Sequence, residues 1–220
     1  MKTALFDLDG TLIASVPDLA AAINLTRADF GLPAIPEETI RDAIGEGMRS
    51  LVQRTIPELR DRLDELLATQ KRNYAEHCLD KTRLYPDTKE TLLALREAGW
   101  KLALVTNKPA ELTGKIVDGL GLAPLLDVVI GGGDAPTLKP DPESLFLAAE
   151  RMSVQLDETD WMIGDNFTDL QAAKRAGIRS CYCRFGFGDP RNESYTAVVD
   201  SMRELRNLVL VTAAGGGSDK

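Results

Sequence analysis

Two acidic residues, Asp7 and Asp9, stand one position apart directly after the first predicted strand. That strand, Thr3 to Phe6, is uncharged and partly branched, which is typical of a buried parallel strand. Because side chains alternate along a strand, the two carboxylates share a face at the strand's carboxyl end. Acids so placed repel each other and resist loss of water, and a divalent cation would compensate them. The alternative is a solvated strand end before a turn at Gly10.

Polar residues also mark three further strand ends or adjacent loops, at the sheet edge where parallel sheets bind ligands. They are Thr106 with Asn107, Lys139 with Pro140, and Asp165 with Asp169. Each has an ordinary explanation by itself: a helix cap, a solvated surface charge, or acids favoured in the first turn of a helix. Polar groups of complementary kind at four places along one edge instead favour a single site.

Phosphoryl transfer is the chemistry that suits this set. Asp7 can attack phosphorus and form an aspartyl-phosphate, which divides one difficult displacement into two easier ones. Lys139 and Mg²⁺, the latter held by Asp7, Asp165 and a backbone carbonyl, can neutralise an anionic substrate. The Thr106 hydroxyl can bind the phosphoryl oxygens. Asp9 is then free to protonate the leaving oxygen and later to activate water.

An alternation of strands and helices positions these residues. Strands are predicted at 101–105, 127–130, 161–163 and 179–183 with helices between them, which favours a parallel sheet covered on both faces. Between residues 15 and 80 only helices are predicted, at 19–30, 37–44, 48–55 and 57–79. We therefore predict an α/β core at 1–14 and 81–212, an all-helical insertion at 15–80 and a flexible tail at 213–220.

Two glycine clusters are not interpreted as ligand sites. Gly131-Gly132-Gly133 lacks the glycine spacing of a dinucleotide-binding site, and Gly186-Phe187-Gly188 is interpreted as a turn.

Composition limits the partners. The 220 residues carry a formal net charge of −8, so nucleic acid and anionic membrane surfaces are poor partners. No apolar run approaches the roughly 20 residues that span a bilayer, and Asp7 and Asp9 interrupt any signal peptide. Three cysteines without metal-ligand spacing and a single histidine, His77, predict reduced thiols, no zinc site and a cytoplasmic enzyme. The oligomeric state stays open.

Four segments together resemble the motifs of the haloacid dehalogenase superfamily. They are Asp7-Leu8-Asp9-Gly10-Thr11-Leu12, Thr106-Asn107-Lys108, Lys139-Pro140-Asp141-Pro142, and Gly164-Asp165 with Asp169. The match spans nearly the whole chain, and the helical insertion resembles the mobile cap of the phosphoglycolate-phosphatase-like branch. The resemblance implies a Rossmann-like core with a helical cap domain, Mg²⁺ as cofactor, and a small phosphate monoester, phosphoglycolate-like or a sugar phosphate, as substrate.

The resemblance also implies roles for single residues. The expected catalytic groups are Asp7 as nucleophile, Asp9 as general acid/base and Lys139 as charge neutraliser. Thr106 and Asn107 are expected to bind the substrate. The expected metal-binding residues are Asp7, Asp9 and Asp165, with Asp169 supporting them from behind.

The loop that contains Gly45 and Gly47 resembles the specificity loop of related caps. Its glycines allow a tight turn and close approach to a ligand. Arg49, which follows them, is suited to bidentate binding of a second anionic group on the substrate. The alternative is that Arg49 is a surface residue in the first turn of a helix.

Three departures from the family pattern weaken an assignment to phosphoglycolate itself. Ala14 stands where many relatives have an acid, Asp87 where many have glycine, and the stretch 166–168 is uncommon. A phosphosugar mutase shares every core motif and remains an alternative. A carbon–halogen hydrolase is disfavoured by Asp9, and a non-catalytic binding protein is disfavoured by four intact motifs.

Overall fold

The computed structural model describes residues 2–214 and contains a six-stranded sheet. The strand order is β5-β4-β1-β6-β7-β8, and every neighbouring pair is parallel. The predicted Rossmann-like α/β fold is therefore confirmed. The strands are β1 (Thr3–Phe6), β4 (Lys101–Pro109), β5 (Val128–Gly132), β6 (Trp161–Gly164), β7 (Arg179–Cys183) and β8 (Ala197–Val199).

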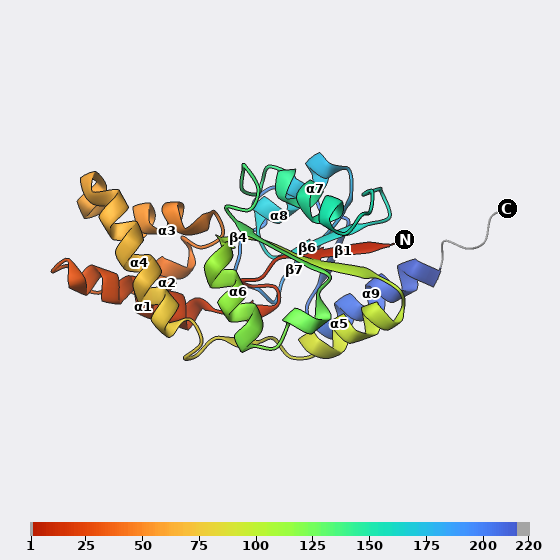
Figure 1. Cartoon of the computed structure of the whole chain (residues 1–220), viewed down its shortest axis with the longest axis horizontal. Helices are drawn as coiled ribbons and strands as arrows, with labels where there is room; N and C mark the ends of the chain where they lie inside the picture. Colours follow the sequence, from red (N-terminus) through yellow and green to blue (C-terminus); the bar gives the residue numbers. More distant parts are fainter. Residues whose placement is uncertain (1, 215–220) are drawn as a thin grey trace.

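Helices cover both faces of the sheet (Figure 1). Helices α7 and α8 pack on one face, over inward side chains such as Leu5. Helices α5, α6 and α9 pack on the other face, over Phe6. Because successive strand residues point to opposite faces, β1 is buried along its whole length. The helices are α5 (Thr88–Glu97), α6 (Ala110–Gly119), α7 (Glu143–Arg151), α8 (Phe167–Ala176) and α9 (Met202–Ala214).

A second group of helices lies beyond one end of the sheet, at the left of Figure 1. We call residues 15–80 the cap. Its helices are α1 (Val16–Asp29), α2 (Glu37–Arg41), α3 (Gly47–Thr55), the 3₁₀ segment η1 (Pro57–Arg62) and α4 (Leu63–His77). Two short antiparallel strands, β2 (Ile13–Ala14) and β3 (Arg83–Leu84), connect the cap to the core.

The buried carboxylate of Asp18 ties the two connections together. Asp18 stands in the first turn of α1, and it accepts hydrogen bonds from the backbone amides of Lys81 and Thr82 at 2.7–3.0 Å. The Thr82 hydroxyl donates a further bond to it at 2.8 Å. The cap therefore enters and leaves the core at one fixed point.

The single helix predicted for residues 57–79 is wrong. Leu59 has non-helical backbone angles (φ −124°, ψ 41°), so η1 ends before α4 begins at Leu63. Glu58 in η1 pairs with the buried Arg27 of α1 at 2.7 Å, and this tertiary contact holds the segment in place. Strand β4 also runs four residues past its predicted end, through an irregular register between Val105 and Pro109.

Short or unusual backbone segments were not predicted. Strands β2, β3 and β8 have two or three residues, too few to show a readable alternation. Asp87 has φ +62°, in the left-handed region that favours glycine, and it contacts Arg203 at 3.2 Å. Helix α9 reaches Ala214, two residues into the predicted tail. Residues 215–220 of that tail lie outside the described residues.

Candidate active site

Lys139 lies between two carboxylates at the end of β1. Its Nζ is 2.9 Å from Asp7 Oδ1 and 2.6 Å from Asp169 Oδ1, and it also donates to the carbonyl oxygen of Val105 at 2.6 Å. Burial by itself lowers the pKa of this lysine, but the two acids outweigh burial and the pKa of Lys139 is raised. Lys139 is therefore a permanent buried cation beside the expected nucleophile.

Three buried carboxylates lie close together in the site. Oxygens of Asp7, Asp165 and Asp169 all lie within 4.8 Å of one another. Burial and then the charges of Asp7 and Asp169 raise the pKa of Asp165 well above its usual range. Burial likewise raises the pKa of Asp169 to about 6, although Lys139 opposes this shift. Lys139 contacts two of these three carboxylates, so the cluster keeps excess negative charge and offers the oxygen ligands that a hard divalent cation prefers.

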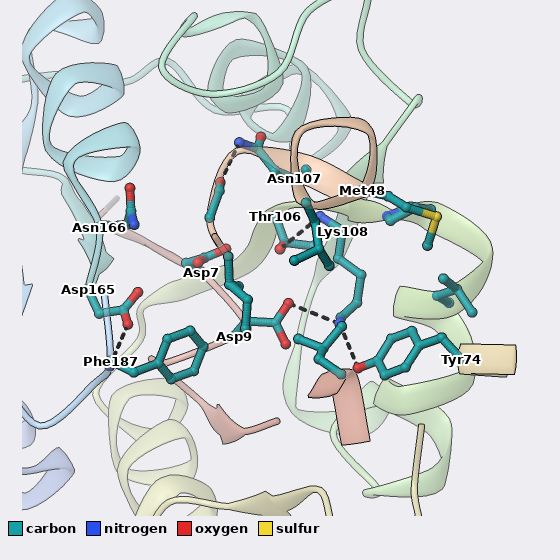
Figure 2. Close-up of a pocket in the computed structure, with 17 residues that line it drawn as sticks. Asp7, Asp9, Met48, Tyr74, Thr106, Asn107, Lys108, Asp165, Asn166 and Phe187 are labelled. Atoms are coloured by element: carbon teal, nitrogen blue, oxygen red, sulfur yellow. Dashed lines mark hydrogen bonds and ion pairs between the residues drawn. The ribbon is translucent and has the colours of Figure 1, made fainter. Parts of the chain in front are cut away.

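A glycine-containing turn after β7 holds Asp165. The backbone amide of Phe187 donates to Asp165 Oδ2 at 3.0 Å (Figure 2). The backbone amide of Gly188 donates to the same oxygen at 2.7 Å. A Cβ at Gly186 would lie only 2.3 Å from the Gly10 carbonyl oxygen and 2.5 Å from Asp165. The segment 186–188 does turn, as predicted, but it also supports the acidic cluster, a function that the sequence interpretation missed.

The capping of α8 holds Asp169. Its carboxylate accepts a hydrogen bond from the Asn166 backbone amide at 3.0 Å, while the Asn166 side chain caps the same helix. This reciprocal arrangement is a capping box, which satisfies two free amides at the helix start. Asp169 therefore contacts Lys139, the start of helix α8 and the other acids of the cluster, and its supporting role behind the metal ligands stays a prediction.

Asp9 is oriented away from the acidic cluster. Its Oδ2 is 3.0 Å from Lys108 Nζ (Figure 2). Its Oδ1 accepts a hydrogen bond from Ser15 Oγ at 2.5 Å. Its side chain is not among the three clustered carboxylates of the described residues. The expected roles of Asp9 in metal binding and in proton transfer stay predictions.

Thr106 and Asn107 both line the pocket. The buried Thr106 accepts a hydrogen bond from the Lys108 amide at 3.3 Å, which leaves its hydroxyl proton for another acceptor. The Asn107 side chain bonds the Lys139 backbone on both sides, at 2.8 Å each, and donates to the Gly45 carbonyl at 3.1 Å. Asn107 therefore joins the Lys139 loop to the cap, and its direct contact with substrate stays a prediction.

The cap closes the far side of the pocket with mainly apolar groups. The lining side chains from the cap are Leu19, Ile44, Met48, Leu51 and Tyr74, with Gly45 and Gly47 contributing backbone. Arg49 is not among the lining residues of the described chain; its side chain is 62% exposed and lies 3.9 Å from Asp64. The role expected for Gly45 and Gly47 agrees with their position, whereas a role for Arg49 in recognition stays a prediction.

Two buried polar side chains in the pocket had no predicted role. Lys108 was recognised only as part of the motif after β4, although a lysine beside strand-end acids could have been identified as their partner. Tyr74 stands in α4, 34 residues earlier, and it accepts a hydrogen bond from Lys108 Nζ at 2.8 Å. Nothing in the local sequence of α4 distinguishes Tyr74 from a core aromatic residue.

Comparison with known proteins identifies the protein family to which the chain belongs. The family model described as "Haloacid dehalogenase-like hydrolase" matches residues 4–183. The chain belongs to this family and is a hydrolase, which confirms the predicted resemblance.

Individual relatives are similar over nearly their whole length. The chain is 38% identical to a phosphoglycolate phosphatase of Vibrio parahaemolyticus, covering 97% of this chain and 98% of the relative. It is 34% identical to one of Nitrosospira multiformis, with 95% and 96% covered. A crystal structure of a predicted phosphoglycolate phosphatase from Haemophilus somnus superposes with a TM-score of 0.88 at 29% identity, covering 94% and 97%.

Within residues 2–214, no helix has both the length and the apolar character needed to cross a bilayer.

Proposed function

We propose that this protein is a Mg²⁺-dependent phosphatase that hydrolyses a small phosphate monoester through an aspartyl-phosphate on Asp7. The observation that carries the proposal is the convergence of Lys139 and three buried carboxylates beside one pocket. The hydrolase family and the phosphoglycolate phosphatases among its relatives support the same reaction.

Three free, buried cysteines support a cytoplasmic location.

The acidic cluster fits Mg²⁺. It offers oxygen ligands alone, and Lys139 contacts two of its three acids, Asp7 and Asp169. Asp7 and Asp165 would hold the ion with their carboxylates, and Asp9 with its backbone carbonyl. When bound, Mg²⁺ supplies positive charge that neutralises the cluster and the phosphoryl oxygens.

The first half-reaction forms the covalent intermediate. A carboxylate oxygen of Asp7 attacks phosphorus, and the bond from phosphorus to the leaving oxygen breaks. Lys139 neutralises negative charge beside Asp7, and the Thr106 hydroxyl binds the phosphoryl oxygens as their charge shifts. Asp9 in its protonated form donates its proton to the leaving oxygen, so an alcohol departs and Asp9 becomes a carboxylate.

The second half-reaction regenerates the enzyme. A water molecule attacks phosphorus of the aspartyl-phosphate, and Asp9 accepts its proton. The bond between phosphorus and Asp7 breaks, which releases inorganic phosphate and restores the Asp7 carboxylate. Asp9 ends protonated, as it began. The apolar side chains of the docked cap exclude other water during these steps.

The phosphoglycolate phosphatases among the relatives support a small substrate such as phosphoglycolate or a sugar phosphate. We therefore infer that the cap opens to admit the ester and closes before chemistry. In the closed position seen here, Lys71 of α4 pairs with Glu111 of α6 at 2.5 Å, and Asn107 bonds Gly45. The exposed Lys71–Glu111 pair is weak, typically below about 1 kcal/mol, so it does not prevent opening.

A substrate screen tests the proposal. Small phosphate monoesters, with phosphoglycolate and hexose phosphates among them, are incubated with the protein and Mg²⁺. We expect stoichiometric release of inorganic phosphate and the free alcohol. A rearranged sugar phosphate without phosphate release would identify a mutase instead, and inertness toward every ester would contradict the proposal.

Metal removal should stop the reaction. We expect excess chelator to abolish turnover and added Mg²⁺ to restore it, because the acids otherwise repel an anionic ester. Asp165→Asn keeps an acceptor for the amides of Phe187 and Gly188 but removes a ligand charge, so the Mg²⁺ requirement should rise by about 10–100-fold or more. Asp134→Asn, in an exposed loop, is the matched control. Full activity in excess chelator rules out the mechanism.

The turn at 186–188 should be intolerant of a single methyl group. Gly186→Ala would force the turn away from Asp165, and we expect at least about a tenfold loss of turnover from misplacement of the cluster. Gly114→Ala, in α6 with open space around its Cβ position, should keep full activity and gain about 0.5–1 kcal/mol of stability. Circular dichroism shows whether both fold. Equal activity of the two variants would contradict the role of the turn.

A further inference from the structure

The two carboxylate oxygens of Asp9 are held by different side chains, and both side chains lead to the cap. Oδ1 is bound by Ser15, the first residue of the cap. Oδ2 is bound by Lys108, whose Nζ also donates to the hydroxyl oxygen of Tyr74 in α4. A continuous chain of polar contacts therefore runs from Asp9 through Lys108 to the cap (Figure 2).

The part of this chain formed by Lys108 and Tyr74 is buried. The Lys108 side chain is 4% exposed and Tyr74 is fully buried. Burial by itself lowers the pKa of Lys108, but Asp9 and Tyr74 outweigh burial and the pKa is raised, so the amine stays charged. Its ammonium also lies 4.4 Å from the centre of the Tyr74 ring. Tyr74 thus fixes the end of a flexible side chain through both its hydroxyl and its ring.

Proton delivery requires an acid that is aimed at the leaving oxygen. A carboxylate turns freely about its terminal bond unless both oxygens are held, and Ser15 and Lys108 hold one each. Lys108 can hold its oxygen only while its own four-carbon chain is fixed, and Tyr74 belongs to the part of the molecule that closes over the substrate. Docking of the cap and alignment of the acid are therefore connected by one lysine.

We propose that Lys108, fixed by Tyr74 of the docked cap, is a positioning residue that orients Asp9 for proton transfer to the leaving oxygen. The proposal rests on the proposed function, because Asp9 is the general acid only in that reaction. It assigns to the cap a part in the chemistry beyond exclusion of water: the acid is aligned when the cap is closed.

The test compares three small esters by their kcat/KM values, which report on the steps up to alcohol release. Ethyl phosphate has a poor leaving group that needs a proton, and phosphoglycolate adds a carboxylate to a similar leaving group. Acetyl phosphate is of similar size, but its acetate leaves without a proton. Phosphate is followed continuously in a coupled assay, and the spontaneous rate is subtracted. The variants are Tyr74→Phe, Lys108→Met and Lys108→Arg, with Met48→Leu as an apolar control in the same pocket.

We expect Tyr74→Phe and Lys108→Met to lower kcat/KM for ethyl phosphate and phosphoglycolate equally, by roughly 10- to 100-fold, within the range of general acid catalysis. Acetyl phosphate should lose less than about threefold, because its leaving group needs no aimed proton. Lys108→Arg should recover part of the loss. Tyr74→Phe should add little in the Lys108→Met background, since the two residues act as a unit. Met48→Leu should affect the three esters alike.

The other outcomes overturn the proposal. A loss confined to phosphoglycolate would make Lys108 a ligand for the substrate's acid group. An equal loss with all three esters would make the pair structural. If Lys108→Met fails to fold, Tyr74→Phe, which removes only one oxygen atom, tests the proposal through the same comparison of kcat/KM values among the three esters. Asp9→Asn distinguishes failure of the proposed function from failure of this inference. Normal ethyl phosphate turnover by Asp9→Asn would reject the proposed function itself. If Asp9→Asn loses this turnover but Tyr74→Phe keeps it, only this inference is rejected.

Discussion

Asp7→Asn should fold and lose turnover by at least about 10⁴-fold, the scale on which removal of a covalent nucleophile acts. The amide cannot attack phosphorus, yet it matches the carboxylate in shape and still offers Lys139 an acceptor. Removal of one of three clustered charges relieves repulsion, so the folded state should be as stable as the wild type or more so. Phosphate release under saturating Mg²⁺ and thermal unfolding measure the two effects.

Asp160→Asn is the matched control for this experiment. Asp160 is also buried, but it binds the Thr3 amide at the opposite end of the sheet, at 2.6 Å. Its replacement should alter stability and leave kcat unchanged. A second measurement follows the covalent intermediate: rapid acid quenching should trap phosphate on the wild-type chain and none on Asp7→Asn. Turnover of that variant within tenfold of the wild type would refute the nucleophile.

The residues at the strand ends could be predicted from the sequence for a physical reason. A parallel sheet brings the carboxyl ends of its strands together, so Asp7, Thr106 and Asp165 converge although long stretches of chain separate them. Each stands where an apolar run stops, and that boundary is visible in one sequence. The helical insertion was equally readable, because its apolar stripes have helical spacing and no strand interrupts them.

The groups that hold these residues could not be predicted in the same way. Tyr74 meets Lys108 across the boundary between cap and core, and the turn at 186–188 approaches Asp165 through backbone amides. Such contacts depend on how the folded helices, strands and turns pack against one another. Neither the hydrophobic periodicity of a segment nor the composition of a turn predicts them. The break at Leu59 has the same origin, because the ion pair of Glu58 with Arg27 of α1 overrides the helical pattern of its own segment.

Lys139 should carry the largest share of stability of any single side chain in the site. Its ammonium is 1% exposed and contacts Asp7 and Asp169, so Lys139→Met leaves buried carboxylates without a counter-charge. Removal of one partner from a buried ionic cluster costs about 3–5 kcal/mol. For a chain of this size the midpoint of thermal unfolding should fall by about 6–20 °C in metal-free buffer. Turnover should be lost as well, because nothing else offsets the Asp7 charge from that side.

Lys101→Met provides the comparison, since Lys101 pairs with Asp127 at 3.1 Å and its side chain is 36% exposed. This variant should lose less than about 1 kcal/mol of unfolding free energy.

The double variant Lys139→Met/Asp169→Asn separates the two roles of Lys139. It removes one of the two stranded charges and should recover part of the lost stability, because uncompensated burial and not lost packing causes the defect. It should recover no turnover, because Asp7 still lacks its cation. A double variant that regains activity together with stability would show that Lys139 supports the fold and takes no part in the chemistry.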